Sequence, residues 1–550
     1  MSYNECSEQP QKMLQIDFRP PSVLELIMHY FTYPLGEFMS FQKHFHIVWI
    51  ALLLLTFNHL SFSHEGHKVD DIILTKLGDL GKVEFPISCK VVDQKALNTG
   101  VALLHHMMYA QAEIFFQKWI TKSPNCAMFY WGYSMSLFHP LWPDTISPEA
   151  LGRGVNSLEK AQNINVTERE KNYIEAAGAY YKNWQNTVDK MRVASWANAQ
   201  KKVFQKNPRD IDAIAFYALS ELSIASKKDA TFKQQKEAGQ RLNEIFVKHP
   251  THPGAIHYSI HAYDNPILAS LATDVVTAYG KIAPDVPHAL HMPSHVFVRL
   301  GNWDEVIAWN IRSANAALKY PTKNATSMHY IHAIDYLVYG YMQTDNAPGA
   351  IKAIEDIKSH HPIQATFPAA YALSTIPARL ALERHDWVNA RQLKTRDPEY
   401  FDWDKFPQVE AITYFARGLG AAKTNDLVAA KKNLKILDEL YAKTLDISPG
   451  YWAVLVDAQR QVVTAWVSYA QGDKANALKQ LKKAADLEDS LDKDPVTPGA
   501  VLPARELLAD MFMLNGDYSD ALMAYQVSLK ANPYRLNSLS GANAAKKQIH

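Results

Sequence analysis

The stretch GDYSDALMAYQVSLKANP, residues 516–533, places Ala521, Tyr525 and Pro533 at intervals of four and eight positions. Gly516 belongs to the residue type that most often ends helices, because glycine adopts the left-handed backbone conformation without steric cost. The small Ala521 lets a second helix approach the first closely, and Tyr525 fills the space between the two. Pro533 cannot continue the second helix. These residues predict a helix-turn-helix hairpin.

The same spacing recurs along the chain and resembles the tetratricopeptide (TPR) repeat, a helical hairpin of about 34 residues. Ala238, Ala272 and Val306 follow one another at intervals of 34 residues, so the middle repeats are expected to be contiguous. Registered on such markers, the sequence predicts repeats at 93–126, 219–252, 253–286, 287–320, 331–364, 458–491 and 502–535.

The residues between the markers are apolar at helical spacing and lack the alternating, β-branched runs of strands. We therefore expect an all-α fold, a TPR-like helical-hairpin solenoid (superhelix) over residues 90–550, after a lead-in segment at 64–89. Residues 150–211 have a helical pattern that matches the repeat poorly. In such a solenoid each hairpin buries its apolar face against its neighbours.

The first 63 residues have the layout of an N-terminal extension followed by a secretory signal peptide. Lys43 lies in a short polar head, residues 47–57 form an apolar run, and small and polar residues end at Ser63. The pattern predicts cleavage near Ser63 and an exported protein, periplasmic or secreted. The apolar run is too short for a stable membrane span. A buried amphipathic helix is the alternative interpretation, and translation starting at Met39 instead of Met1 would place the signal at the terminus.

The charges are balanced, with 57 Lys and Arg against 56 Asp and Glu. No net field would attract nucleic acid or anionic lipid, so we expect neither as a partner. A TPR groove usually holds a peptide, and a peptide or protein ligand is therefore the expected partner.

Cys89 and Cys126 are expected at the two ends of the first predicted hairpin. Because an antiparallel hairpin brings its ends together, a Cys89–Cys126 disulfide is predicted, in keeping with an oxidising compartment. It would close a loop of about 36 residues and contribute roughly 3 kcal/mol in the chain-entropy model. Two separate buried thiols are the alternative.

Histidines fall in register on the predicted first helices of three consecutive repeats. In TPR domains, positions 2, 5, 9 and 12 of this helix line the concave groove, and they are the positions occupied here. The predicted groove-binding residues are His257, His261, Asp264, His288, His291, His295, His332, Asp335 and Tyr339.

Neutral imidazole is a good ligand for zinc, copper and iron, and two histidines four residues apart lie on one helix face. His257, His261, His291 and His295 are therefore candidate ligands for a divalent transition metal, with Asp264 and Asp335 as ligands or as acceptors for an imidazole N–H. The alternatives are a site for a small polar molecule, groove lining for a peptide or protein, ordinary packing, and a metal-dependent hydrolase or oxidoreductase. The common catalytic motifs, including His-Glu-x-x-His and Gly-x-Ser-x-Gly, do not occur. The sequence thus predicts a ligand-binding scaffold and leaves enzymatic activity open.

Four blocks are more specific than a generic repeat: GVALLHHMMYAQAEIFFQKW (100–119), CAMFYWGYSMSLFHPLW (126–142), HPGAIHYSIHAYDNP (252–266) and PHALHMPSHVFVRLGNWDEV (287–306). They resemble a family of exported bacterial TPR-containing proteins. The resemblance implies the helical fold and the exported location, and it assigns no catalytic residue.

Overall fold

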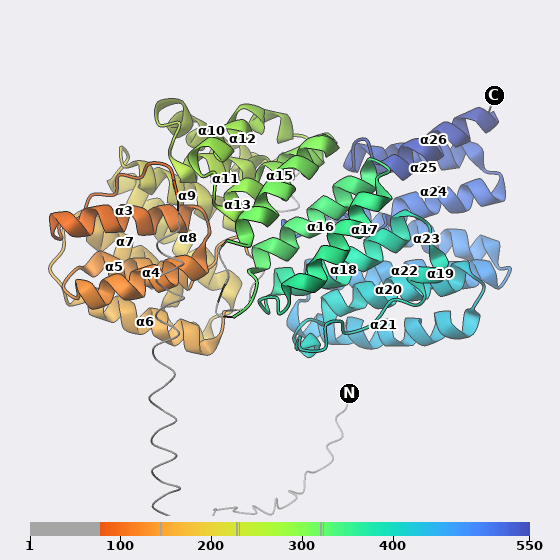
Figure 1. The fold of residues 1–550 in the computed structure, drawn as a ribbon, viewed down its shortest axis with the longest axis horizontal. Helices are drawn as coiled ribbons and strands as arrows, with labels where there is room; N and C mark the ends of the chain where they lie inside the picture. Colours follow the sequence, from red (N-terminus) through yellow and green to blue (C-terminus); the bar gives the residue numbers. More distant parts are fainter. Residues whose placement is uncertain are drawn as a thin grey trace, which may run out of the picture. The chain divides into compact units, whose positions relative to one another are not determined.

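The computed structural model describes residues 78–142, 146–226, 229, 231–319, 322 and 324–549. The predicted extension and signal peptide lie outside these residues. The described part is helical, with only two isolated β-bridges, Thr322 to Ala325 and Thr326 to Ile363. Figure 1 follows the helices from α3 (orange) to α26 (blue). None of the described helices has both the length and the apolar composition to cross a membrane.

The helices have the following bounds. In the first half they are α3 (Val91–His105), α4 (Tyr109–Lys122), α5 (Ala127–Ser136), α6 (Pro148–Gln162), α7 (Glu168–Tyr181), α8 (Asp189–Lys206), α9 (Ile211–Ile224), α10 (Lys233–Lys248), α11 (Pro253–Tyr263), α12 (Thr273–Ile282), α13 (Pro287–His291), α14 (Pro293–Leu300) and α15 (Trp303–Ala317). In the second half they are α16 (Met328–Gln343), α17 (Ala347–Ile357), α18 (Phe367–Glu383), α19 (Trp387–Ala390), α20 (Pro407–Lys423), α21 (Leu427–Ile447), α22 (Tyr451–Ala470), α23 (Lys474–Asp489), α24 (Ala504–Asn515), α25 (Tyr518–Ala531) and α26 (Leu536–Ile549).

Successive helices pack as hairpins, as the TPR-like pattern predicts. Gly516 ends α24 with φ +84° and Gly301 ends α14 with φ +69°, a conformation that side chains with a Cβ rarely adopt. Ala521 and Tyr525 of α25 are buried between the helices, as their spacing requires. The chain is therefore an all-α, TPR-like solenoid of helical hairpins.

The buried apolar side chains form two large cores that meet near α15 and α16. The first contains residues from Leu80 to Ala316, and the second contains residues from Ala314 to Met511. Tyr336 and Tyr339 of α16 belong to the first core, so α16 joins the two. The predicted histidines lie on α11, α13, α14 and α16, helices that are neighbours in the middle of Figure 1.

The segment between α23 and α24 packs against the inner face of the middle repeats. Tyr336 donates its hydroxyl hydrogen to the Pro495 carbonyl at 3.1 Å. Arg379 of α18 donates to the carbonyls of Gly499 and Ala500 at 3.3 and 3.1 Å. The inner face of α16 and α18 is therefore covered by the protein's own chain.

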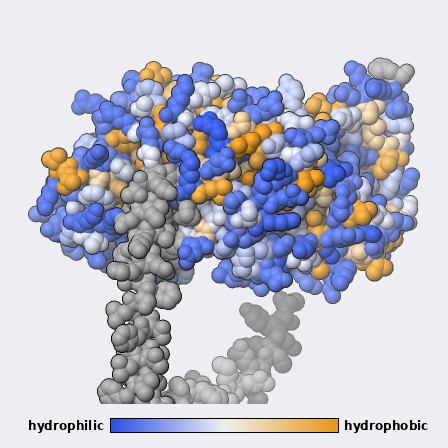
Figure 2. Space-filling view, in the orientation of Figure 1, coloured by the Kyte–Doolittle hydropathy of each residue, from blue (hydrophilic) through white to orange (hydrophobic). Residues whose placement is uncertain are grey.

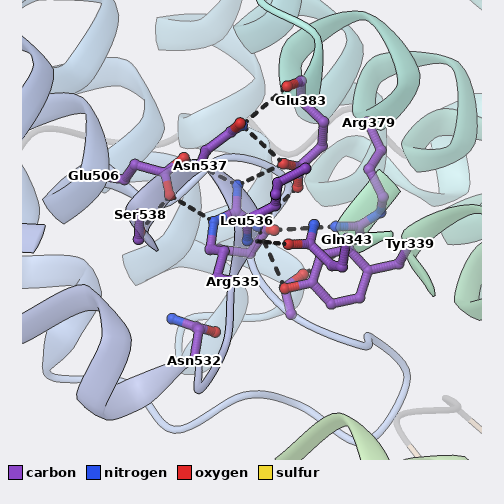
Figure 3. A network of polar contacts seen from close by, with 12 residues as sticks. Tyr339, Gln343, Arg379, Glu383, Glu506, Asn532, Arg535, Leu536, Asn537 and Ser538 are labelled. Carbon is purple, nitrogen blue, oxygen red and sulfur yellow. Dashed lines mark hydrogen bonds and ion pairs between the residues drawn. The ribbon is translucent and has the colours of Figure 1, made fainter. Parts of the chain in front are cut away.

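A buried arginine fixes the last hairpins against the same helices (Figure 3). Arg535 is fully buried and pairs with Glu383 of α18 and Glu506 of α24, with N–O distances of 2.8 Å to each. The Leu536 amide donates to Gln343 of α16 at 2.9 Å. Since a buried charge is stable only when it is paired, this cluster holds α16, α18 and α24 in one arrangement.

Cys89, just before α3, and Cys126, the N-cap residue of α5, form a disulfide with 5.5 Å between their Cα atoms. It joins the two ends of the α3–α4 hairpin, and Cys126 is buried in the first core. The crosslink restricts the unfolded chain and thereby stabilises the fold.

We predict that replacing both cysteines, Cys89→Ala with Cys126→Ala, lowers the free energy of unfolding by about 3 kcal/mol, because the unfolded chain regains the entropy of the closed loop. Urea unfolding followed by circular dichroism measures the change. A reductant should destabilise the wild-type protein and leave the double variant unaffected. Equal urea midpoints for the two proteins would contradict the prediction.

Candidate functional site

Six of the predicted histidines form two adjacent groups of three in the interior. The first cluster contains His257, His261 and His288, and the second contains His291, His295 and His332. In each cluster one nitrogen per ring can be chosen so that the three lie within 4.8 Å of one another. The ring centroids of His261 and His295, one from each cluster, are 6.1 Å apart. The repeat register thus brings imidazoles from three hairpins together.

Local helix geometry produces the clusters. His257 and His261 lie one turn apart on α11, on one face. Pro293 begins α14 directly after α13, so the pair His291 and His295 spans the junction of two short helices. His332 comes from α16, which packs against α13.

Hydrogen bonds fix the protonation of two rings in the second cluster. His291 Nδ1 lies 2.8 Å from the Asn310 side-chain oxygen, while the Asn310 amide nitrogen donates to the Val306 carbonyl. That oxygen is an acceptor, so His291 Nδ1 carries the hydrogen. His295 Nδ1 likewise donates to the Asp264 carboxylate at 3.0 Å. In the neutral rings both Nε2 atoms therefore present lone pairs.

These two Nε2 atoms face each other at 3.0 Å. Two lone pairs at this distance repel unless a proton or a metal cation lies between them. Burial lowers the pKa of His291 well below its ordinary value, and His332 and His295 lower it further. Burial also lowers the pKa of His295, against the opposing effect of Asp264. Protonation of either ring is thus unfavourable. A tetrahedral zinc ion with Zn–N bonds of about 2.0–2.1 Å would hold two ligand nitrogens about 3.3 Å apart, close to the 3.0 Å between these two atoms.

The first cluster has the same character. His257 Nδ1 donates to the His105 carbonyl at 2.6 Å, which leaves Nε2 with a lone pair. Within the described residues, that atom, His261 Nε2 and both His288 nitrogens have no hydrogen-bond partner. In the second cluster His332 Nδ1 also has none. Each unpaired buried polar atom costs about 1–3 kcal/mol, so a concentration of them makes the two clusters a candidate ligand site.

A third group containing histidines serves as a contrast, because its hydrogen bonds are complete. His105 Nε2 and His252 Nε2 lie 2.8 and 3.3 Å from one Asp212 oxygen. The other ring nitrogens are bonded to the Tyr258 hydroxyl and the Ala255 amide. This group therefore packs α3, α9 and α11 together, and all four of its imidazole nitrogens are already hydrogen-bonded.

The predicted carboxylates have different surroundings from each other. Asp264 accepts from His295, from Arg299 at 2.9 Å and from Lys493 at 2.8 Å. Burial opposes its ionisation, but Lys493 and Arg299 outweigh burial and hold the Asp264 pKa well below its usual range. Because its oxygens already accept these hydrogen bonds, Asp264 holds the His295 ring in place through Nδ1 and leaves Nε2 directed toward the cluster.

Asp335 and Tyr339 belong to neither cluster. Asp335 faces Arg379, whose Nε lies 3.4 Å away, and burial raises the Asp335 pKa to about 6 although Arg379 opposes the shift. The Tyr339 hydroxyl accepts from Arg535 at 3.3 Å, and its ring lies beneath the Arg379 guanidinium. Both residues therefore serve the contact with the C-terminal hairpins.

A cavity of about 40 Å³ borders both clusters. It has room for about three water molecules at 10–15 Å³ each. Its wall includes two histidines of each cluster, two methionines and the segment before α24: His261, His288, His295, His332, Met292, Met328, Pro495 and Val496.

The predicted groove residues are thus enclosed instead of lining an open groove. All the histidines among them are buried except His261, which is partly exposed. The insertion of residues 492–500 explains the difference, because repeat spacing fixes which side chains face inward but not what covers them. Asn310, Arg299 and Lys493 also contact the second cluster or its carboxylate. They lie outside the groove positions of the repeat, and their contacts join residues distant in sequence, so the repeat spacing does not indicate their roles.

We predict that Asp335→Asn removes a pH dependence of stability. A carboxyl whose pKa is raised from 3.8 to about 6 stabilises the fold below pH 3.8, and this contribution is lost as the pH rises through 6. Asparagine stays neutral throughout, so the variant should gain about 2.4 kcal/mol relative to wild type between pH 4 and pH 7.5. Urea unfolding at both pH values measures this difference, with the exposed Asp304→Asn as control. A difference that does not change with pH would contradict the assignment.

No family model and no curated protein matches the chain. Among solved structures, the APC/C hetero-tetramer Cut9–Hcn1 is similar over 82% of this chain and 89% of that chain, with 9% identity and a TM-score of 0.31. Yeast Tom70 is similar over 83% of this chain and 96% of its own, with 14% identity and a TM-score of 0.28. Similarities of this degree carry no argument about ligand, partner or activity. The description of the chain as a TPR-like solenoid rests on its own helix pairs.

Proposed function

We propose that this protein is a solenoid scaffold that holds a transition-metal ion in its interior, at the second cluster. The observation that carries the proposal is the pair of Nε2 atoms of His291 and His295, 3.0 Å apart, with both Nδ1 atoms engaged by oxygen acceptors. His332 supplies a third nitrogen. Three imidazoles with one position left open are a donor set that zinc, copper and iron accept.

The surroundings support a binding function over chemistry on a large substrate. The bordering cavity measures about 40 Å³, which admits water or a molecule of similar size. A peptide reaching the histidines would have to displace residues 492–500 and break the Lys493–Asp264 ion pair. A metal-dependent hydrolase acting on a larger substrate would meet the same obstacle.

A protein partner would accordingly use the outer surface. Figure 2 shows hydrophobic residues on one face as small separate groups among hydrophilic ones. The most exposed apolar side chains, Val91, Val247 and Val428, lie on α3, α10 and α21, helices in different parts of the chain. Scattered positions of this kind are ordinary for a soluble surface, so they do not by themselves define an interface.

We further propose that the protein is exported. The Cys89–Cys126 disulfide supports this, because disulfides form in oxidising compartments and are rare in the cytosol. The apolar run at 47–57 would act as the signal.

We expect the wild-type protein to retain at least one equivalent of zinc, copper or iron after loading and exhaustive dialysis. The combined change His291→Ala with His295→Ala should remove that ion, because it deletes two of three ligands. Elemental analysis by mass spectrometry measures the metal. The exposed His249→Ala is the matched control and should retain wild-type content, while circular dichroism checks the folding of each variant. Less than half an equivalent of every metal in the wild type would contradict the proposal.

For export, we expect the mature chain produced in a host with a secretory pathway to begin near residue 64. Intact-mass measurement of the secreted or periplasmic protein determines the N-terminus. A chain that retains residues 47–57 and remains in the cytosol would refute this part of the proposal.

A further inference from the structure

The first cluster is a second group of buried imidazoles with unpaired nitrogens, and it shares none of the hydrogen bonds through which Asn310 and Asp264 orient the second cluster. His257 is fixed by the His105 carbonyl, and its Nε2 atom has no partner in the described residues. His288 is buried, and neither of its nitrogens has a hydrogen-bond partner in the part of the chain that the structure describes. Two of these rings are nine-tenths or more buried and hold unpaired nitrogens, so the cluster has the character of a built site.

The two clusters are close enough to act as one centre. Ring centroids of His261 and His295 are 6.1 Å apart, and those of His288 and His291 are also 6.1 Å apart. The 40 Å³ cavity has two rings of each cluster in its wall. An ion in each cluster would therefore face the same small space.

The charge balance limits which ions can fill both positions. The six ligands are neutral imidazoles, and the nearest carboxylate, Asp264, is already paired with Arg299 and Lys493. Asp335, one turn from His332 on α16, is paired with Arg379, so both acidic side chains that the repeat register places near the clusters already have cationic partners. By Coulomb's law, two divalent ions repel four times as strongly as two monovalent ions at the same distance, and the desolvation cost of each ion rises steeply with its charge. Monovalent ions are therefore favoured for double occupancy.

The side chains around the cavity also favour a monovalent ion, copper(I). Met292 and Met328 are buried and lie in its wall, and thioethers, like imidazoles, are ligands that suit copper(I). Trp142, Leu141, Pro495 and Val496 complete an apolar boundary that restricts water.

We propose that the six histidines form a two-ion centre that holds a pair of copper(I) ions, one in each cluster. This inference rests on the proposed metal-binding function and adds the second site, the number of ions and their oxidation state. It assigns the first cluster as a ligand set in its own right: His257, His261 and His288.

The test is a titration of the full protein with copper(I) under anaerobic conditions. The ion is supplied as its acetonitrile complex, bicinchoninate is the competing chelator, and ascorbate is the reductant so that no added thiol attacks the disulfide. We expect two equivalents of copper(I) per wild-type chain. His288→Leu should reduce this to one equivalent, and His291→Ala with His295→Ala should also reduce it to one, whereas His249→Ala should leave two.

His288→Leu also separates a ligand role from a structural one. Because neither nitrogen of His288 is hydrogen-bonded to a described residue, replacing the ring with an apolar side chain removes two unpaired polar atoms and breaks none of the hydrogen bonds that the structure describes. Without copper the variant should unfold at a temperature equal to or above that of the wild type. A lowered midpoint would indicate that His288 is needed for packing.

The outcomes distinguish the two proposals. One equivalent in the wild type, lost in the His291 and His295 variant and unchanged in His288→Leu, would overturn the two-ion centre and leave the single site standing. No bound copper, zinc or iron in the wild type would overturn both. Two equivalents that persist in His288→Leu would show that the second ion binds elsewhere and would also overturn the inference.

Discussion

The arrangement of the middle repeats depends on one constraint, namely that buried polar atoms must have partners. At His291 and His295 the constraint is unusually sharp, because Asn310 and Asp264 fix both Nδ1 atoms as donors and leave two lone pairs 3.0 Å apart. A buried proton is disfavoured there, as the lowered pKa values indicate. A cation bound by several imidazoles would relieve this repulsion. The unpaired nitrogens of the first cluster also lack hydrogen-bond partners among the described residues.

Closure of the solenoid creates the low-dielectric surroundings in which this constraint acts. The segment before α24 places Lys493 against Asp264 and Pro495 beside the cavity, while Arg535 ties α24 to α16 and α18. The C-terminal hairpins thus act on the histidines without supplying a ligand. They bury the imidazoles around one small cavity, and Lys493 fixes the charge of Asp264.

The sequence was sufficient for the fold and for the convergence of the histidines, because both follow from periodicity. Ala238, Ala272 and Val306 set the register, and a fixed register places residues four apart on one inward face. It was insufficient for the closure, since nothing in the spacing of α23 and α24 indicates that the segment between them fills the groove. Asp335 and Tyr339 occupy groove positions too, yet they contact Arg379 and Arg535, charges that come from α18 and from the segment before α26. The α20–α21 hairpin lies inside the predicted solenoid of residues 90–550 but outside its best-registered repeats.

Anomalous diffraction from crystals of the metal-loaded protein, recorded at the absorption edge of the bound metal, tests most directly whether His291 and His295 share an ion. The account predicts a peak about 2.0–2.1 Å from Nε2 of both His291 and His295, with His332 turned toward it. If the two nitrogens stay 3.0 Å apart with no peak between them, a shared proton bridges the rings and the metal account is wrong.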